Sequence, residues 1–112
     1  WYRVILGLTE GGATMQTMTT TEVQRAIESG AALKLIDVRE VEEVEAGHIP
    51  GIINIPLSTL ELHMPELHKN EKYIIVCRSG KRSGMATQLL ESHGFDVTNM
   101  VGGMLEWQGE VE

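Results

Sequence analysis

Residues 73–83 read Tyr73-Ile74-Ile75-Val76-Cys77-Arg78-Ser79-Gly80-Lys81-Arg82-Ser83, an apolar run that leads directly into a basic loop. Several bulky apolar residues in succession are typical of a strand buried on both faces, as in a parallel sheet covered by helices. The apolar residues of 85–90 then follow helical spacing, so the sequence predicts a strand, a loop and a helix in that order. Cys77 therefore lies at the carboxyl end of a strand, where open α/β sheets bind their ligands.

The same alternation continues on both sides of this segment. Thr19 and Glu22 have the spacing of a capping box, and they open a predicted helix in which Val23, Ala26 and Ile27 share one face. Further strand-like runs lie at 33–38, 52–55 and 95–101, and further helical segments lie at 40–46, at 58–69 and near Trp107. Strands that alternate with helices imply right-handed parallel crossovers, so we expect an open α/β sheet.

The composition fits one compact domain and excludes several classes of protein. The chain has 112 residues, of which 42% are hydrophobic, and a formal net charge of −7. We expect no nucleic-acid partner, because neutralising a phosphate backbone requires clustered Lys and Arg. We also expect no membrane partner, because the longest apolar run, Val4–Leu8, is far shorter than the roughly 20 residues that span a bilayer.

The cysteine content restricts the chemistry further. Cys77 is the only cysteine, which excludes an internal disulfide and a dithiol redox cycle. A single free thiol suits a reducing compartment, so we expect a cytoplasmic location.

The first 17 residues lack the periodicity of a packed element. The chain begins at Trp1, and Met15 or Met18 could be a native start. We therefore expect residues 1–17 to be an extension, either left by cloning or the trimmed end of a longer protein, and residues 18–112 to form a single domain.

The loop after Cys77 concentrates positive charge on an acidic chain. Arg78, Lys81 and Arg82 are three of the nine basic residues. A loop that turns from strand into helix points backbone N–H groups inward, and the helix N-terminus adds partial positive charge. This arrangement would hold an anion and lower the pKa of the Cys77 thiol below its reference value of about 8.5, which favours the nucleophilic thiolate. The alternative is a buried core cysteine with a raised pKa.

Two groups of titratable residues carry no predicted chemistry. The four histidines lack metal-ligand spacing, so we expect no metal site: His48, His63, His68 and His93. The acidic residues of 40–46 are expected to form a solvated helix face: Glu40, Glu42, Glu43 and Glu45.

Four motifs, in this order between Met18 and Trp107, resemble those of the rhodanese homology domain: Ile36-Asp37-Val38-Arg39-Glu40, Gly47-His48-Ile49-Pro50-Gly51, Cys77-Arg78-Ser79-Gly80-Lys81-Arg82-Ser83, and Gly102-Gly103 followed by Trp107. The resemblance implies a three-layer α/β fold with a five-stranded parallel sheet and helices on both faces. It also implies a sulfurtransferase without a cofactor, in which a cysteine persulfide carries sulfur from a small anionic donor such as thiosulfate to a thiol or cyanide acceptor.

The resemblance also implies roles for individual residues. Cys77 resembles the catalytic, persulfide-forming nucleophile. The residues that follow it resemble the loop that binds the donor: Arg78, Ser79, Gly80, Lys81 and Arg82. Asp37 and Arg39 resemble an ionic pair beneath this loop, His48 resembles a structural turn histidine, and Ser83 borders the loop.

The length of the loop separates the alternative functions. Arg82 is the fifth residue after Cys77, whereas the related phosphatases use a loop one residue longer to surround a larger phosphoryl group. A loop that converges on one sulfur atom has less room for three equatorial oxygens, so the sequence favours a sulfurtransferase. The alternatives are a sulfur-relay or partner-binding module without its own small donor and, with less support, a cysteine phosphatase or arsenate reductase.

Overall fold

The computed structural model describes residues 15–112 and contains one five-stranded sheet, in which all neighbouring strands are parallel. The strands follow the spatial order β1-β5-β4-β2-β3. Their bounds are β1 Thr17–Met18, β2 Lys34–Asp37, β3 Ile53–Asn54, β4 Lys72–Val76 and β5 Asp96–Met100. The strand that carries Cys77 at its end, β4, therefore lies at the centre of the sheet, between β5 and β2.

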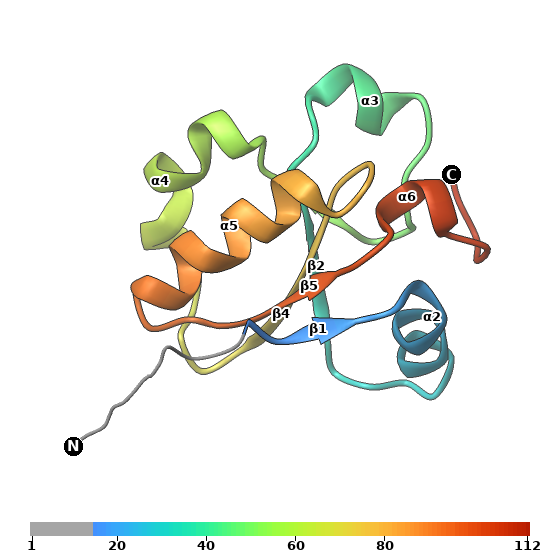
Figure 1. Cartoon of the computed structure of the whole chain (residues 1–112), viewed down its shortest axis with the longest axis horizontal. Coiled ribbons are helices and arrows are strands. Elements are labelled where there is room, and N and C mark those ends of the chain that lie inside the picture. Colours follow the sequence, from blue (N-terminus) through green and yellow to red (C-terminus); the bar gives the residue numbers. More distant parts are fainter. Residues whose placement is uncertain (1–14) are drawn as a thin grey trace.

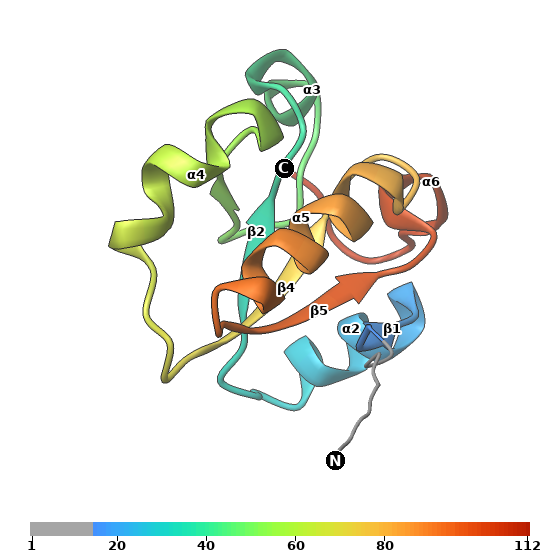
Figure 2. The ribbon, with the colours of Figure 1, turned by 60° about the vertical axis from the view of Figure 1, so that its left-hand side comes forward.

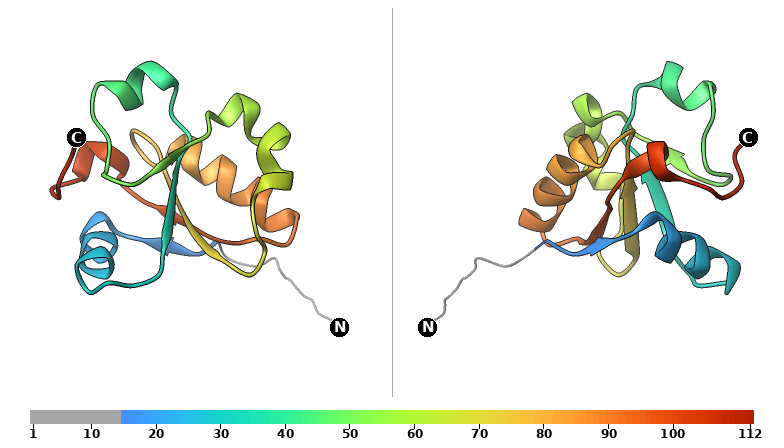
Figure 3. Two further views of the ribbon diagram at one scale, coloured as in Figure 1. Left: turned by 180° about the vertical axis from the view of Figure 1, so that it is seen from behind. Right: turned by 45° about the vertical axis from the view of Figure 1, so that its right-hand side comes forward.

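Helices cover both faces of the sheet, which confirms the predicted architecture (Figures 1 and 2). The helices are α2 Thr20–Glu28, α3 Val41–Glu45, α4 Leu60–His63, α5 Lys81–Ser92 and α6 Gly103–Glu106, with 3₁₀ turns at Leu57–Thr59 and Met64–Glu66 on either side of α4. Helices α4 and α5 lie on one face, whereas α2 and α6 lie on the other (Figure 3). Among residues 15–112, no helix is both long enough and apolar enough to cross a bilayer.

Alternate residues of β4 build a separate core on each face. Tyr73 and Ile75 pack in the cluster that includes Leu90 of α5. Ile74 packs in the opposite cluster, which includes Val23 of α2. A strand whose successive side chains are all buried requires cover on both sides, and this explains the continuous apolar run in the sequence.

The helix α2 begins as its sequence predicts. The Thr19 Oγ1 accepts from the Glu22 N–H at 3.1 Å, and the Thr19 N–H donates to the Glu22 carboxylate at 2.8 Å. The predicted apolar face is only partly correct, because Val23 is fully buried whereas Ile27 is 41% exposed.

The sheet begins slightly earlier than the sequence indicates. Residues 16 and 17 were expected to lie in the extension, but Thr17 belongs to β1, and the Gln16 carbonyl accepts from the Asn99 N–H at 2.9 Å. A two-residue strand is too short to produce an alternating pattern, so the pairing with β5 has no signature in the sequence. The apolar run Val4–Leu8 lies outside the described residues.

Candidate active site

The loop from Cys77 to Gly80 connects β4 to α5 at the carboxyl end of the sheet. In Figure 1 it lies between the start of α5, α6 and α3. Because β4 is the central strand, its end is flanked by the ends of β2 and β5. The position predicted from the strand-loop-helix pattern is therefore the position observed.

The Cys77 thiol is buried and surrounded by hydrogen-bond donors. Its side chain has no solvent-exposed area, and the Gly80 N–H donates to Sγ with an N···S distance of 3.0 Å. On the opposite side, Sγ lies 3.3 Å from the hydroxyl oxygen of Ser83, which is also buried. The sulfur thus lies in a small polar cradle made largely of main-chain groups.

Two opposing influences set the pKa of Cys77. Burial is the largest and raises the pKa, because it disfavours the thiolate. The Ser83 hydroxyl and the backbone N–H groups of Ser83, Gly80 and Ser79 act in the other direction, and the net result is a pKa below the ordinary thiol value. The direction agrees with the sequence-based prediction, and of the two predicted causes, the inward N–H groups and the cations, the N–H groups are among the largest effects that lower the pKa.

The start of α6 holds the loop in this shape. The Met104 N–H donates to the Cys77 carbonyl at 2.9 Å, and the Leu105 N–H donates to the Arg78 carbonyl at 3.0 Å. These bonds turn the two carbonyls away from the sulfur and leave N–H groups facing it. Gly103 permits the approach, because a Cβ there would lie 2.5 Å from the Arg78 carbonyl carbon and oxygen. Gly103 belongs to one of the four motifs of the family resemblance, but its contact with the loop has no local signal in the sequence.

Asn99 of β5 is a residue of the site that the sequence analysis missed. Its Nδ2 donates to the Gly80 carbonyl at 3.2 Å, and its Oδ1 accepts from the Ser83 hydroxyl. The side chain is almost fully buried, so both bonds are shielded from water. The one available signal was a polar residue within a buried strand, since a buried amide requires partners.

The three basic residues of the loop region differ in their surroundings. Arg78 and Lys81 are exposed, and neither takes part in a salt bridge with another of the described residues. In contrast, Arg82 donates from both terminal nitrogens to the Glu43 carboxylate of α3, at 2.7 and 2.9 Å. The hydrogen bond from Arg82 is the main cause that lowers the pKa of Glu43 to about 2. The expectation of a purely solvated acidic face is therefore wrong for Glu43.

Asp37 and Arg39 form a buried ion pair at the end of β2. The Arg39 guanidinium contacts Asp37 at 2.8–3.1 Å, and it also donates to the Gly47 carbonyl at 2.8 Å. These bonds join the two ends of the segment that contains α3, and thereby fix the helix that carries Glu43. The predicted pair exists, and its hydrogen bonds support α3 rather than the Cys77 loop.

His48 lies at the other end of α3. Its Nδ1 is 2.8 Å from the Val44 carbonyl, and its backbone exchanges two hydrogen bonds with Glu112. These contacts agree with a structural turn residue, and they connect the segment after α3 with the C-terminal tail.

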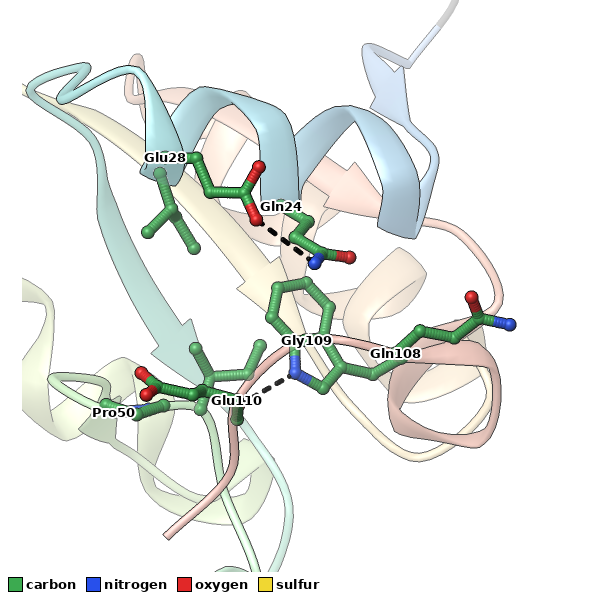
Figure 4. A pocket seen from close by; sticks show the side chains of 9 residues that line it. Gln24, Glu28, Pro50, Gln108, Gly109 and Glu110 are labelled. Atoms are coloured by element: carbon green, nitrogen blue, oxygen red, sulfur yellow. Dashed lines mark hydrogen bonds between the residues drawn. The ribbon is translucent and has the colours of Figure 1, made fainter.

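A cavity lies away from this loop, between α2, the turn at Ile49 and Pro50, and the C-terminal tail (Figure 4). Its volume is about 480 Å³, and its lining includes the exposed Ile27. Trp107, which also lines it, donates from Nε1 to the Glu110 carbonyl at 2.9 Å. The cavity contains neither Cys77 nor any other predicted site residue, so the chemistry is assigned to the loop.

Comparisons with known proteins agree with this architecture. Residues 19–110 match the family model described as "Rhodanese-like domain". The human "Thiosulfate:glutathione sulfurtransferase" is 38% identical over 81% of this chain and 91% of its own length. A crystal structure of a rhodanese-like domain protein from Staphylococcus aureus is 36% identical, covers 88% of this chain and 97% of its own, and superposes with a TM-score of 0.83.

YrkF of Bacillus subtilis is a longer relative. It is 38% identical over 92% of this chain, and the chain spans 56% of its length. The domain therefore also occurs within larger proteins. With a family model that matches nearly all of the described residues, and with the fold and the cysteine loop in the expected places, the chain belongs to the rhodanese-like domain family.

Proposed function

We propose that this protein is a sulfurtransferase in which Cys77 carries sulfur as a persulfide between a small donor and a thiol or cyanide acceptor. Sulfur transfer is supported at the level of the family, because the matching relatives include proteins named as sulfurtransferases. One observation carries the proposal for this chain. The Cys77 thiol is buried, its Sγ accepts a hydrogen bond from the Gly80 N–H with an N···S distance of 3.0 Å, and the hydrogen bonds of the loop lower the pKa of the thiol.

The geometry suits a reaction in two halves. In the first, the Cys77 thiolate attacks the outer sulfur of a donor such as thiosulfate, a new S–S bond forms, and sulfite leaves with the electron pair of the broken bond. In the second, the acceptor attacks the outer persulfide sulfur and regenerates the thiolate. The negative charge on sulfur is preserved throughout, so the same N–H groups stabilise the thiolate and the persulfide.

The predicted site residues divide between two tasks. The backbone N–H groups of Ser79, Gly80 and Ser83 hold the sulfur, while the exposed Arg78 and Lys81 attract the anionic donor. Arg82 borders the loop and is paired with Glu43. No step requires a metal or an organic cofactor. We propose a cytoplasmic location, because a thiolate of low pKa needs reducing conditions to remain free.

Mass spectrometry provides the direct test. After treatment with thiosulfate, the protein should gain one sulfur atom on Cys77, and cyanide should remove it as thiocyanate. Cys77→Ser should abolish both events, and full thiocyanate formation by that variant would contradict the proposal. Hydrolysis of aryl phosphates should remain near background, and robust hydrolysis would favour the phosphatase alternative.

A further inference from the structure

We propose that Glu43 is a specificity-determining residue, which pairs with Arg82 and so selects donors of low negative charge, such as an alkyl persulfide, over a dianion such as thiosulfate. This inference rests on the proposed function and specifies its donor class. The structural basis is a bidentate ion pair, in which Arg82 Nη1 lies 2.7 Å and Nη2 lies 2.9 Å from the two carboxylate oxygens of Glu43.

Arg82 is otherwise well placed to attract anions to Cys77. It is the second residue of α5, directly after the loop that holds the sulfur. The pKa of Arg82 is raised, mainly by its hydrogen bond to Glu43, and burial acts in the opposite direction. The negative charges of Glu43, Cys77 and Glu40 raise it further. The thiolate and this guanidinium therefore influence each other. With Glu43 neutralising Arg82, an approaching donor meets an ion pair instead of an unpaired cation.

The position of Glu43 is itself fixed. Its carboxylate accepts from the Glu40 N–H at 3.0 Å as part of the capping box of α3. The bond between Arg39 and the Gly47 carbonyl then secures the segment that holds this helix. A carboxylate that is already held in place pairs with Arg82 at a low entropic cost, so an incoming anion must break a preformed contact in order to recruit Arg82.

The charge balance near the sulfur follows from this pairing. Arg78 and Lys81 retain their charges and remain exposed, whereas Arg82 is balanced by Glu43, and Glu40 adds a further negative charge nearby. Two exposed cations suffice for a monoanion, but a compact dianion lacks the third positive charge, because Arg82 is paired with Glu43. The site is thus biased toward donors with less charge.

Replacing Glu43 by Gln tests the inference. The variant E43Q keeps an oxygen that can accept from the Glu40 N–H, and it removes both the charge and one of the two acceptor oxygens that Arg82 contacts. In the full chain, the rates of Cys77 alkylation by iodoacetate, an anion, and by iodoacetamide, which is neutral, are measured and expressed as a ratio. This ratio cancels changes in the fraction of thiolate. We expect it to rise about threefold or more in E43Q, with a similar fall in KM for thiosulfate.

Glu45→Gln is the matched control, because Glu45 is an exposed residue of the same helix and the change in net charge is identical. Equal ratios in E43Q and E45Q would overturn the inference. If circular dichroism shows that E43Q is poorly folded, Glu43→Ser removes the same carboxylate and provides the same readout. Alkylation does not depend on sulfur transfer. If the iodoacetate-to-iodoacetamide ratio rises in E43Q but the protein forms no persulfide, the proposed function is refuted, whereas the effect of Glu43 on anions stands.

Discussion

Burial and hydrogen bonding act in opposite directions on Cys77. A thiolate without solvent would be costly, yet the N–H groups and the Ser83 hydroxyl around Sγ reverse the sign of the effect. The reactivity of this residue therefore depends on a few donors within hydrogen-bond distance. Removing one of these donors should therefore change the pKa of Cys77 by a measurable amount.

Ser83→Ala should raise the pKa of Cys77, because the variant loses the hydroxyl beside Sγ, which lowers this pKa when its one proton turns from Asn99 Oδ1 to the thiolate. The midpoint of the pH dependence of iodoacetamide alkylation reports this change. Ser92→Ala, at an exposed position of the same helix, should leave the midpoint at its wild-type value. A midpoint in Ser83→Ala at or below that of the wild type would contradict the role of the hydroxyl.

The same shift affects stability in a defined direction. Since the folded thiol binds its proton less tightly than the unfolded thiol, the free energy of unfolding should increase as the pH rises from the folded pKa to the unfolded pKa. Above the unfolded pKa the gain is complete, and it is lost as the pH falls through the folded pKa. Urea unfolding at several pH values should show a smaller increase for Ser83→Ala.

Asn99→Leu should destabilise the protein and slow the alkylation of Cys77. The variant leaves the Gly80 carbonyl and the Ser83 hydroxyl without their shared partner, at a cost of about 1–3 kcal/mol for buried polar groups. Urea unfolding and alkylation rates measure the two effects. Thr98→Val, at the neighbouring position with its side chain on the other face of β5, serves as the control. Equal behaviour of the two variants would show that Asn99 does not support the loop.

At the scale of elements, the short helix α6 acts as a support for the Cys77 loop. It contains four residues and would be marginal in isolation. Its N–H groups nevertheless bind the Cys77 and Arg78 carbonyls, and only a glycine at position 103 permits the contact. The loop is therefore held by hydrogen bonds from both α6 and the end of β5.

Gly103→Ala should disrupt the contact between α6 and the Cys77 loop. The new Cβ would lie 2.5 Å from the Arg78 carbonyl oxygen, at a backbone φ of +58°. Gly30→Ala provides a matched control, because Gly30 also has a positive φ, of +80°, but no atom lies within 4 Å of the added carbon. We expect Gly103→Ala to lose about 1–3 kcal/mol more than Gly30→Ala, the usual range for overpacking. Similar losses in both variants would indicate that the close contact relaxes easily.

The strand β1 provides a second prediction at this scale. Deleting residues 1–18 removes the Gln16 carbonyl that accepts from Asn99 of β5 and the Met18 carbonyl that accepts from Val101, the residue after β5. Compared with deletion of residues 1–14, this truncation should lower the midpoint of thermal unfolding and slow the alkylation of Cys77, because β5 also carries Asn99. Identical midpoints would show that β1 contributes little to the sheet.

For the molecule as a whole, the main elements and the place of Cys77 in the sheet were predictable because both depend on local patterns. The continuous apolar run of β4 indicated a strand with cover on both sides, and the order of strand, loop and helix indicated the edge where Cys77 lies. The motif resemblance supplied the number of strands. The capping box of α2 was equally local.

The contacts that tune the site were not predictable in this way. Arg82 and Glu43 are 39 positions apart, and Asn99 is 19 positions from Gly80, so neither pair leaves a pattern within a single element. The basic residues indicated that the loop would be cationic, whereas the folded chain balances one of the three with an acid from another helix. Only the topology of the sheet brings these residues together.

The cradle around Cys77 also has a consequence for the tolerance of the sequence to change. Because main-chain N–H groups hold the sulfur, every residue type except proline can supply them, so the exposed side chain of Ser79 is free to vary without loss of the cradle, and a change at the exposed Lys81 alters only the charge that a donor meets. Glycines 80 and 103 lack this freedom. Drift at the two exposed positions could therefore adapt one scaffold to different donors and acceptors while its sulfur chemistry is inherited unchanged.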